Sequence, residues 1–296
     1  MSDQVNYPEK FLDIYKVDGC VNIDTEPFFE REECYPNFQE DLVNFKNLLI
    51  ELVKNNESKT FYKFGDGDYW FLKKVPSGSA SPGRRALSKS YEDINHQLFI
   101  DGSKKCDYYT CEIYTHNRQF FREVIPNQEI HFPAEYGYAL ISNKWILKTF
   151  SGKIGLIGAD AKINLIKNLM EASQYQDYLG IEKFEDYILL PQLFACDDIE
   201  ATERMVGEQL EKSSSKIFLM GMGHVKSGLI HRLKKYTDAV FLDVGSAIDA
   251  LAGIIDVERP YFGDWTNYQI NDPKLYEHLD YLGYHRKGKH ILLERI

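Results

Sequence analysis

The sequence predicts an α/β fold: a Rossmann-like, mostly parallel sheet flanked by helices, with an N-terminal elaboration. Two observations lead to this prediction. The second half of the chain alternates short apolar runs with amphipathic segments, which is the pattern of strand–helix units in a parallel sheet. Two of these runs also end in glycine turns, at Gly158 and Gly221, directly before an expected helix. Ligands of such sheets bind beyond the carboxyl ends of the strands, so functional residues are expected there.

The composition is typical of a globular protein with one or two domains. The chain has 296 residues, 44% of them hydrophobic, and carries a net charge of −10. That charge argues against a nucleic-acid partner, because nucleic acids bind cationic surfaces. The five cysteines form no CxxC pair, and no apolar run reaches membrane-spanning length. We therefore expect a cytoplasmic protein with no membrane span, and leave open whether it forms a homo-oligomer.

In the first half, apolar residues at helical spacing predict a helix over 41–54, followed by a strand over 59–64. Residues 1–40 have no clear period and are expected to form an irregular arm, which leaves 41–296 as a single domain. The other elements expected in this half are a loop at 76–85, a helix at 88–100, and short strands near 107–113 and 129–133.

The second half predicts four strand–helix units in succession. Asp197 or Asp198 is the expected N-cap of the helix in the second unit. The expected strands are 153–158, 187–191, 216–220 and 239–243, and the helices that follow them are 161–171, 198–212, 224–235 and 246–255. A last short strand is expected at 291–294.

The strand over 59–64 runs into Phe64-Gly65-Asp66-Gly67-Asp68, which we call the FGDGD segment. Gly65 and Gly67 permit a tight turn and a close approach of the backbone to a ligand. Asp66 and Asp68 could direct oxygen ligands at one divalent cation, Mn²⁺ or Mg²⁺. With Lys63 beside the pair, the segment predicts a metal and nucleotide-phosphate site; the alternative is a glycine turn with solvated carboxylates.

A second candidate site is the glycine turn (residues 221–226), which lies between a strand and a helix. Gly221, Gly223, His224 and Lys226 are its candidate nucleotide-binding residues, because backbone N–H groups at a glycine-rich helix start attract phosphate. The spacing fits neither a Walker A loop nor GxGxxG. An ordinary tight turn is the alternative.

Three further residues are candidates on weaker grounds. Arg84 and Arg85, in the loop at 76–85, could clamp a diphosphate, although a solvated loop explains them equally well. Asp249 is the candidate general base toward an acceptor hydroxyl, and a charge on a helix surface is its alternative.

The order of these motifs resembles the GT-D-type glycosyltransferases over roughly residues 41–256. The resemblance lies mainly in the FGDGD segment, where the family has Glu at the position of Asp68. Three later features continue it: Pro191 with Phe194-Ala195, Gly221, and Asp243-Val244-Gly245. A second departure is Ser246-Ala247, where the family often has a histidine.

The resemblance implies a Rossmann-like fold, a UDP-sugar donor, a glycan-type or other hydroxyl acceptor, and a divalent cation, usually manganese, held by Asp66 and Asp68. Two other functions are left open. One is another nucleotide-dependent enzyme, such as an adenosyl-cofactor methyltransferase that uses the turn at 153–160 or 221–226. The other is a non-catalytic nucleotide-sugar-binding module.

Overall fold

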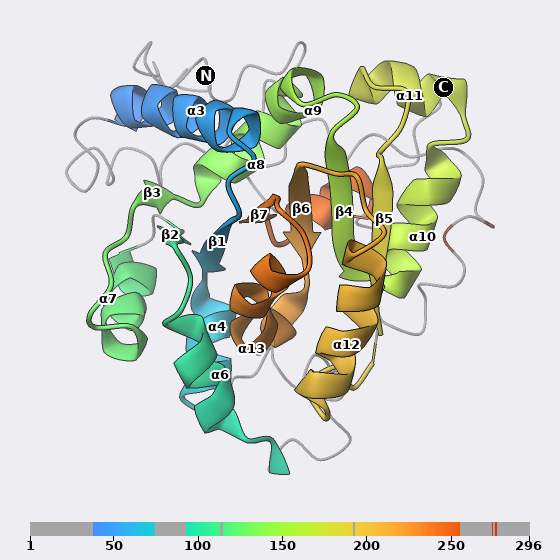
Figure 1. Cartoon of the computed structure of the whole chain (residues 1–296). Helices are drawn as coiled ribbons and strands as arrows, with labels where there is room; N and C mark the ends of the chain where they lie inside the picture. Colours follow the sequence, from blue (N-terminus) through green and yellow to red (C-terminus); the bar gives the residue numbers. More distant parts are fainter. Residues whose placement is uncertain are drawn as a thin grey trace, which may run out of the picture.

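The computed structural model describes residues 38–74, 93–112, 115–191 and 193–254, together with Lys274 and Tyr276. The centre of this part is a seven-stranded sheet in which all neighbours run parallel, in the order β3-β2-β1-β7-β6-β4-β5 (Figure 1). The predicted α/β, Rossmann-like fold class is therefore confirmed. The strands are β1 (Lys59–Phe64), β2 (Tyr108–Cys111), β3 (Phe132–Pro133), β4 (Ile154–Ala159), β5 (Asp186–Leu190), β6 (Ile217–Gly221) and β7 (Val240–Asp243).

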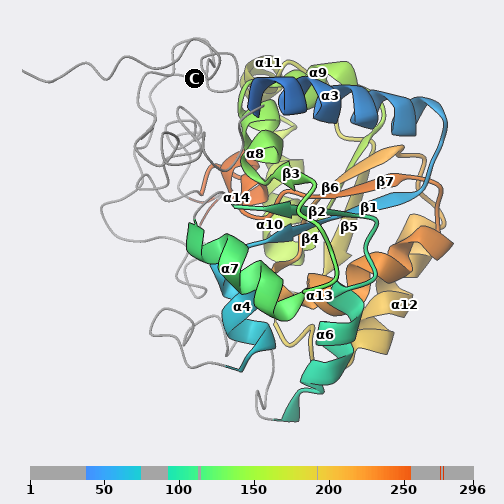
Figure 2. The ribbon, with the colours of Figure 1, turned by 90° about the vertical axis from the view of Figure 1, so that its left-hand side faces the viewer.

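Helices cover both faces of the sheet (Figure 2). The first face is packed by α3 (Phe38–Lys54), α8 (Glu135–Ser142), α9 (Trp145–Thr149), α10 (Asp160–Leu169), α11 (Ser173–Leu179) and α14 (Ala247–Leu251). The second face is packed by α4 (Asp66–Leu72), α6 (His96–Ser103), α7 (Thr115–Val124), α12 (Ile199–Leu210), α13 (Lys226–Leu229) and the 3₁₀ segments η2 (Gly223–Val225) and η3 (Ile230–Lys235).

The central strands are apolar along their whole length because both of their faces are buried. In β6, Ile217 and Leu219 belong to the core of the first face, whereas Phe218 and Met220 belong to the core of the second. All four side chains are fully buried. Successive strand residues point to opposite faces, so a continuous apolar run fills two cores at once.

The neighbouring strands β1 and β7 form a topological switch point. β1 continues into α4 on the second face, whereas β7 continues into α14 on the first. The two strands pair directly, with Phe61 opposite Leu242. Where the connections of two adjacent strands diverge in this way, a crevice opens beyond their carboxyl ends. The FGDGD segment begins at the end of β1, so it lies at this switch point.

Most expected elements in the described part are found, with differences at their ends. Helix α3 begins at Phe38, so the last three residues of the expected arm are helical. Asp198 caps α12 by accepting a hydrogen bond from the Ala201 N–H, as predicted. The segment 224–235 is largely 3₁₀ rather than one regular helix. Residues 1–37, the loop at 76–85 and the strand at 291–294 lie outside the described residues.

The stretch between β2 and β4 contains helices that the sequence did not predict. α7, α8 and α9 lie there, among many aromatic residues that obscure the helical period. No helix in the described part of the chain is long and apolar enough to cross a membrane.

Candidate functional site

The FGDGD segment is the start of a helix, so the predicted tight turn at Gly65 and Gly67 is wrong. Gly65 is extended and caps α4, which begins at Asp66. The Gly65 N–H donates to Asp68 Oδ2 at 2.9 Å, and the Asp68 N–H donates to the Gly65 carbonyl at 3.1 Å. An acidic residue at the third helical position satisfies a free N–H at the helix start in this way. Asp68 therefore has a local structural role.

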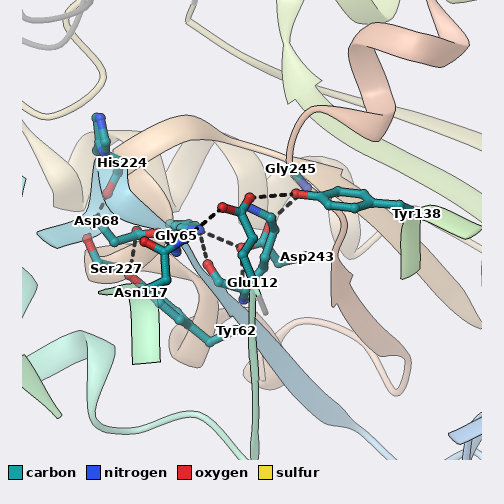
Figure 3. A network of polar contacts seen from close by, with 12 residues as sticks. Tyr62, Gly65, Asp68, Glu112, Asn117, Tyr138, His224, Ser227, Asp243 and Gly245 are labelled. Carbon is teal, nitrogen blue, oxygen red and sulfur yellow. Dashed lines mark hydrogen bonds and ion pairs between the residues drawn. The ribbon is translucent and has the colours of Figure 1, made fainter. Parts of the chain in front are cut away.

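The Asp68 carboxylate also belongs to a buried cluster with Lys226, Asp243 and Tyr62, which we call the Lys226 cluster. Figure 3 labels Asp68, Asp243 and Tyr62 of this cluster. Lys226 Nζ lies 3.2 Å from Asp68 Oδ2 and 2.9 Å from Asp243 Oδ2. The same ammonium donates to the Lys63 carbonyl oxygen and lies 4.7 Å from the centre of the Tyr62 ring. Because Lys226 is buried and held by these contacts, it faces inward and not toward solvent.

The charges in the Lys226 cluster keep Asp68 ionised. Burial on its own would raise the pKa of Asp68, but Lys226, and then His224 and Lys63, outweigh it and hold this pKa below its ordinary value. The pKa of Tyr62 is raised well above its usual range, first by burial and then by the charge of Asp68. Tyr62 therefore stays protonated, and its hydroxyl donates a hydrogen bond to Asp68 Oδ1 at 2.8 Å.

A second cluster, the Glu112 cluster, consists of Lys63, Glu112, Asn117 and Tyr138. Figure 3 shows its labelled members Glu112, Asn117 and Tyr138 beside the first cluster. Lys63 Nζ lies 2.8 Å from Glu112 Oε1, to which the Tyr138 hydroxyl donates at 3.1 Å. Asn117 Nδ2 donates to Glu112 Oε2 at 3.1 Å. Burial would lower the pKa of Lys63, but Glu112 and other negative neighbours raise it well above its usual range. Lys63 is therefore a buried ammonium that is charged at neutral pH.

The backbone at Lys63 connects the two clusters at the switch point. The Lys63 N–H donates to Asp243 Oδ2 at 3.1 Å, while its side chain reaches Glu112. Gly65 lies against the same groups, since a Cβ there would be 3.3 Å from both Lys63 Nζ and Glu112 Oε2. The predicted close approach at Gly65 is therefore an approach to the protein's own side chains.

The structure brings the glycine turn into contact with the FGDGD segment. The His224 ring stacks on Phe71 of α4, with centroids 4.9 Å apart, and a Cβ on Gly67 would lie 3.1 Å from His224 Cε1. Gly223 has a φ of +56°, which favours glycine, and it is exposed. Gly221 is tightly packed, because a Cβ there would lie 2.8 Å from the Gly245 carbonyl.

Of the remaining predicted site residues, Asp249 is the one whose side chain is described, and it belongs to neither cluster. Asp249 lies in α14, and its Oδ1 pairs with Lys162 Nζ of α10 at 2.5 Å on the first face of the sheet. Arg84 and Arg85 lie outside the described residues. Asp66 is the first residue of α4, but its side chain is not among those described. The role predicted for each of these residues stays a prediction.

The described residues do not fit a cation held by Asp68. Its two oxygens already accept from Tyr62 and Gly65 and contact Lys226. A divalent ion bound to them would lie about 4 Å from the Lys226 ammonium and be repelled by about 8 kcal/mol at an effective dielectric constant of about 20. The described part of the chain also contains no group of three or more His, Cys, Asp or Glu residues that could hold a metal. The predicted metal site therefore rests on Asp66.

Sequence reasoning missed most of the residues that complete these clusters: Tyr62, Glu112, Asn117 and Tyr138. Asp243 was recognised as a carboxylate at a strand end, but not as the partner of Lys226. Glu112 directly follows β2, the neighbour of β1, so the carboxyl-end rule is the signal that could have found it. Tyr138 comes from α8, a helix that was not predicted, and no sequence signal indicates it.

A cavity of about 430 Å³ lies elsewhere, between α6 and the start of α12. It is lined by Phe99 and other apolar side chains together with several carboxylates, including Asp197 and Asp198. It shares no residue with the Lys226 or Glu112 cluster, so we place the candidate site at the clusters, where charged groups meet the strand ends.

Comparisons with known proteins give one distant likeness. No family model and no curated protein matches the chain. A solved structure described as a new glycosyltransferase (DUF1792) from Streptococcus sanguinis is similar over 78% of this chain and 95% of its own, with 12% identity and a TM-score of 0.43. A likeness this distant does not show membership of a family.

Proposed function

We propose that this protein is a glycosyltransferase that moves a sugar from a nucleotide-sugar donor to a hydroxyl acceptor. One observation carries the proposal: the FGDGD segment and the glycine turn, distant in sequence, meet at the β1–β7 switch point. Nucleotides bind at such points in parallel sheets. The resemblance in the FGDGD segment favours a UDP-sugar as the donor.

The charges at this place suit a departing nucleoside diphosphate. Negative charge develops on the diphosphate as the bond to the sugar breaks, and a fixed positive group stabilises it. Lys63 is kept protonated by Glu112, and its backbone N–H also bonds Asp243 of the Lys226 cluster. We propose that the Lys63 ammonium stabilises the diphosphate. To reach it, the ammonium would move away from Glu112.

Two parts of the proposal rest on the sequence pattern alone. A divalent cation, Mn²⁺ or Mg²⁺, would be held through Asp66 and would supply further positive charge at the diphosphate. Asp249 remains the proposed base for the acceptor hydroxyl. Its pairing with Lys162 means that the ammonium must move aside before this carboxylate can accept a proton.

Thermal unfolding with UDP-, GDP- and CDP-sugars, each with and without Mn²⁺, tests the proposal. A donor that binds only the folded chain raises the midpoint by an amount set by its concentration over its Kd. We expect a UDP-sugar to raise it and to be hydrolysed slowly. Lys63→Met should reduce the shift, whereas Lys183→Met, at an exposed pair with Glu185, should not.

Two other results would each reject the proposed activity, and a third would reject the proposed donor site. Stabilisation by an adenosyl cofactor and by no nucleotide-sugar would indicate a methyltransferase. Stabilisation by a nucleotide-sugar with neither hydrolysis nor transfer to any acceptor would indicate a binding module. A shift that Lys63→Met leaves unchanged would move the donor site away from the two clusters.

A further inference from the structure

We propose that Lys226 is a built-in cation: its ammonium takes the place between Asp68 and Asp243 where a divalent ion would otherwise bind. The acidic pair at the switch point then needs no metal. The inference concerns the donor site of the proposed function and rests on that proposal for its biological meaning. Its test measures cation binding and stability, so it can fail or hold separately from sugar transfer.

The first argument is the convergence of oxygen atoms on one point. Asp68 Oδ2 from α4, Asp243 Oδ2 from β7 and the Lys63 carbonyl oxygen from β1 all contact Lys226 Nζ. Carboxylate and carbonyl oxygens are the ligands of Mg²⁺, Mn²⁺ and Ca²⁺. Three such atoms from three elements form the beginning of a hard-cation site, and an ammonium occupies it.

The second argument is that the ammonium and a divalent ion exclude each other. Lys226 Nζ already contacts Oδ2 of Asp68 and Oδ2 of Asp243, so a metal bound to these same two oxygens would have to share their space with the ammonium. Lys226 is only 6% exposed, and its ammonium also lies over the Tyr62 ring, so it is held in place by contacts on several sides. In the folded protein, Lys226 therefore occupies the position between Asp68 and Asp243 and excludes a metal ion from it.

The third argument is charge balance in a buried place. Asp68 and Asp243 are 5% and 4% exposed, and two buried carboxylates sharing one space repel each other unless a cation lies between them. Lys226 supplies that cation from within the chain. Donor binding at this edge of the sheet then does not depend on a metal held by Asp68, which differs from the function expected for the Asp66–Asp68 pair.

Replacing the lysine should uncover the cation site. In full-length Lys226→Ala we expect the unfolding midpoint to fall by roughly 10 °C, because two buried like charges lose their partner. Mn²⁺ should then raise the midpoint of this variant more than that of the wild type. The extra rise should disappear when Asp68→Asn is added to the same chain.

Lys234→Ala is the matched control, because Lys234 pairs with a single carboxylate, Asp107, at 2.9 Å. Its response to Mn²⁺ should equal that of the wild type. If Lys226→Ala does not fold, the double variant Lys226→Ala with Asp68→Asn is tested in the absence of metal. We expect it to fold, because only one of the two buried carboxylates remains.

The proposal is overturned by any of three results. The first is an equal Mn²⁺ response in the wild type and Lys226→Ala. The second is a wild-type Mn²⁺ response that Asp68→Asn alone abolishes, because the metal would then use Asp68 with the lysine present. The third is a double variant no more stable than Lys226→Ala.

Discussion

Replacing Asp68 by alanine removes a carboxylate that is 5% exposed and serves three partners at once. The Tyr62 hydroxyl and the Gly65 N–H lose their acceptor, and Lys226 loses one of its two carboxylates. If Asp68 is an internal anchor, the fold depends on it. If Asp68 is instead a metal ligand open to solvent, its loss has little effect on the fold in the absence of metal.

The magnitude follows from these contacts. Losing the cap costs about 1 kcal/mol, and leaving the buried Tyr62 hydroxyl unpaired costs about 1–3 kcal/mol. Breaking a buried ion pair outright costs about 3–5 kcal/mol, but Lys226 keeps Asp243. Since these losses overlap, we expect Asp68→Ala to lower the free energy of unfolding by about 3 kcal/mol. Asp68→Asn keeps an oxygen for Tyr62 and should cost less.

Urea unfolding of the full chain, followed by circular dichroism, measures this difference. Asp177→Ala is the control: this exposed residue of α11 should change the free energy of unfolding by no more than about 0.5 kcal/mol. A loss of less than about 1 kcal/mol in the free energy of unfolding for Asp68→Ala would refute the reasoning. Removing a carboxylate that has three buried partners should destabilise the fold by more than this.

Four further predictions concern the same region. The pKa of Asp68 is lower in the folded than in the unfolded protein, where it is about 3.9. The stability that Asp68 contributes is therefore complete above about pH 3.9 and is lost as the pH falls through the folded pKa. In urea titrations, Asp68→Ala should reduce this loss of stability at acid pH. Asp66→Ala should abolish sugar transfer with the unfolding midpoint retained, and full turnover would reject its role. Glu112→Gln should shift the alkaline limb of the pH–rate profile to lower pH, because Lys63 loses the carboxylate that raises its pKa; an unchanged limb contradicts this. Gly221→Ala should cost about 1–3 kcal/mol in urea unfolding, since its Cβ would lie 2.7 Å from Ile248 Cγ1, whereas Gly137→Ala, with 3.6 Å to its nearest neighbour, should be tolerated.

Local sequence patterns predicted the strands well and the helices unevenly. The strand over 59–64 was predicted at its observed bounds, because its apolar run is short and ends at a glycine. α8 was missed, because Tyr136, Tyr138 and its aliphatic residues are buried so evenly that no amphipathic stripe remains. The FGDGD segment was misjudged as a turn, since glycine at 65 and 67 suggests one, whereas Asp68 stabilises a helix start by bonding back to Gly65.

The candidate site was predicted only in part. Lys63, Asp68 and Lys226 were identified, but as residues facing a ligand, and the structure pairs each of them with another side chain. The pattern of glycines and charges indicates where a functional edge lies. It does not indicate which charges neutralise one another.

The sequence by itself determined the secondary-structure alternation, and with it a parallel sheet whose functional residues lie at the strand ends. These features depend on neighbours within a few residues, and local periodicity reports them. Only the tertiary structure decided that β7 lies beside β1, and that Lys226 therefore meets Asp68 and Asp243. The physical reason is that strand order and the burial of a charge depend on contacts between segments far apart in the chain. Lys226, Asp68 and Asp243 become buried partners only when the fold brings their three segments together and removes them from water.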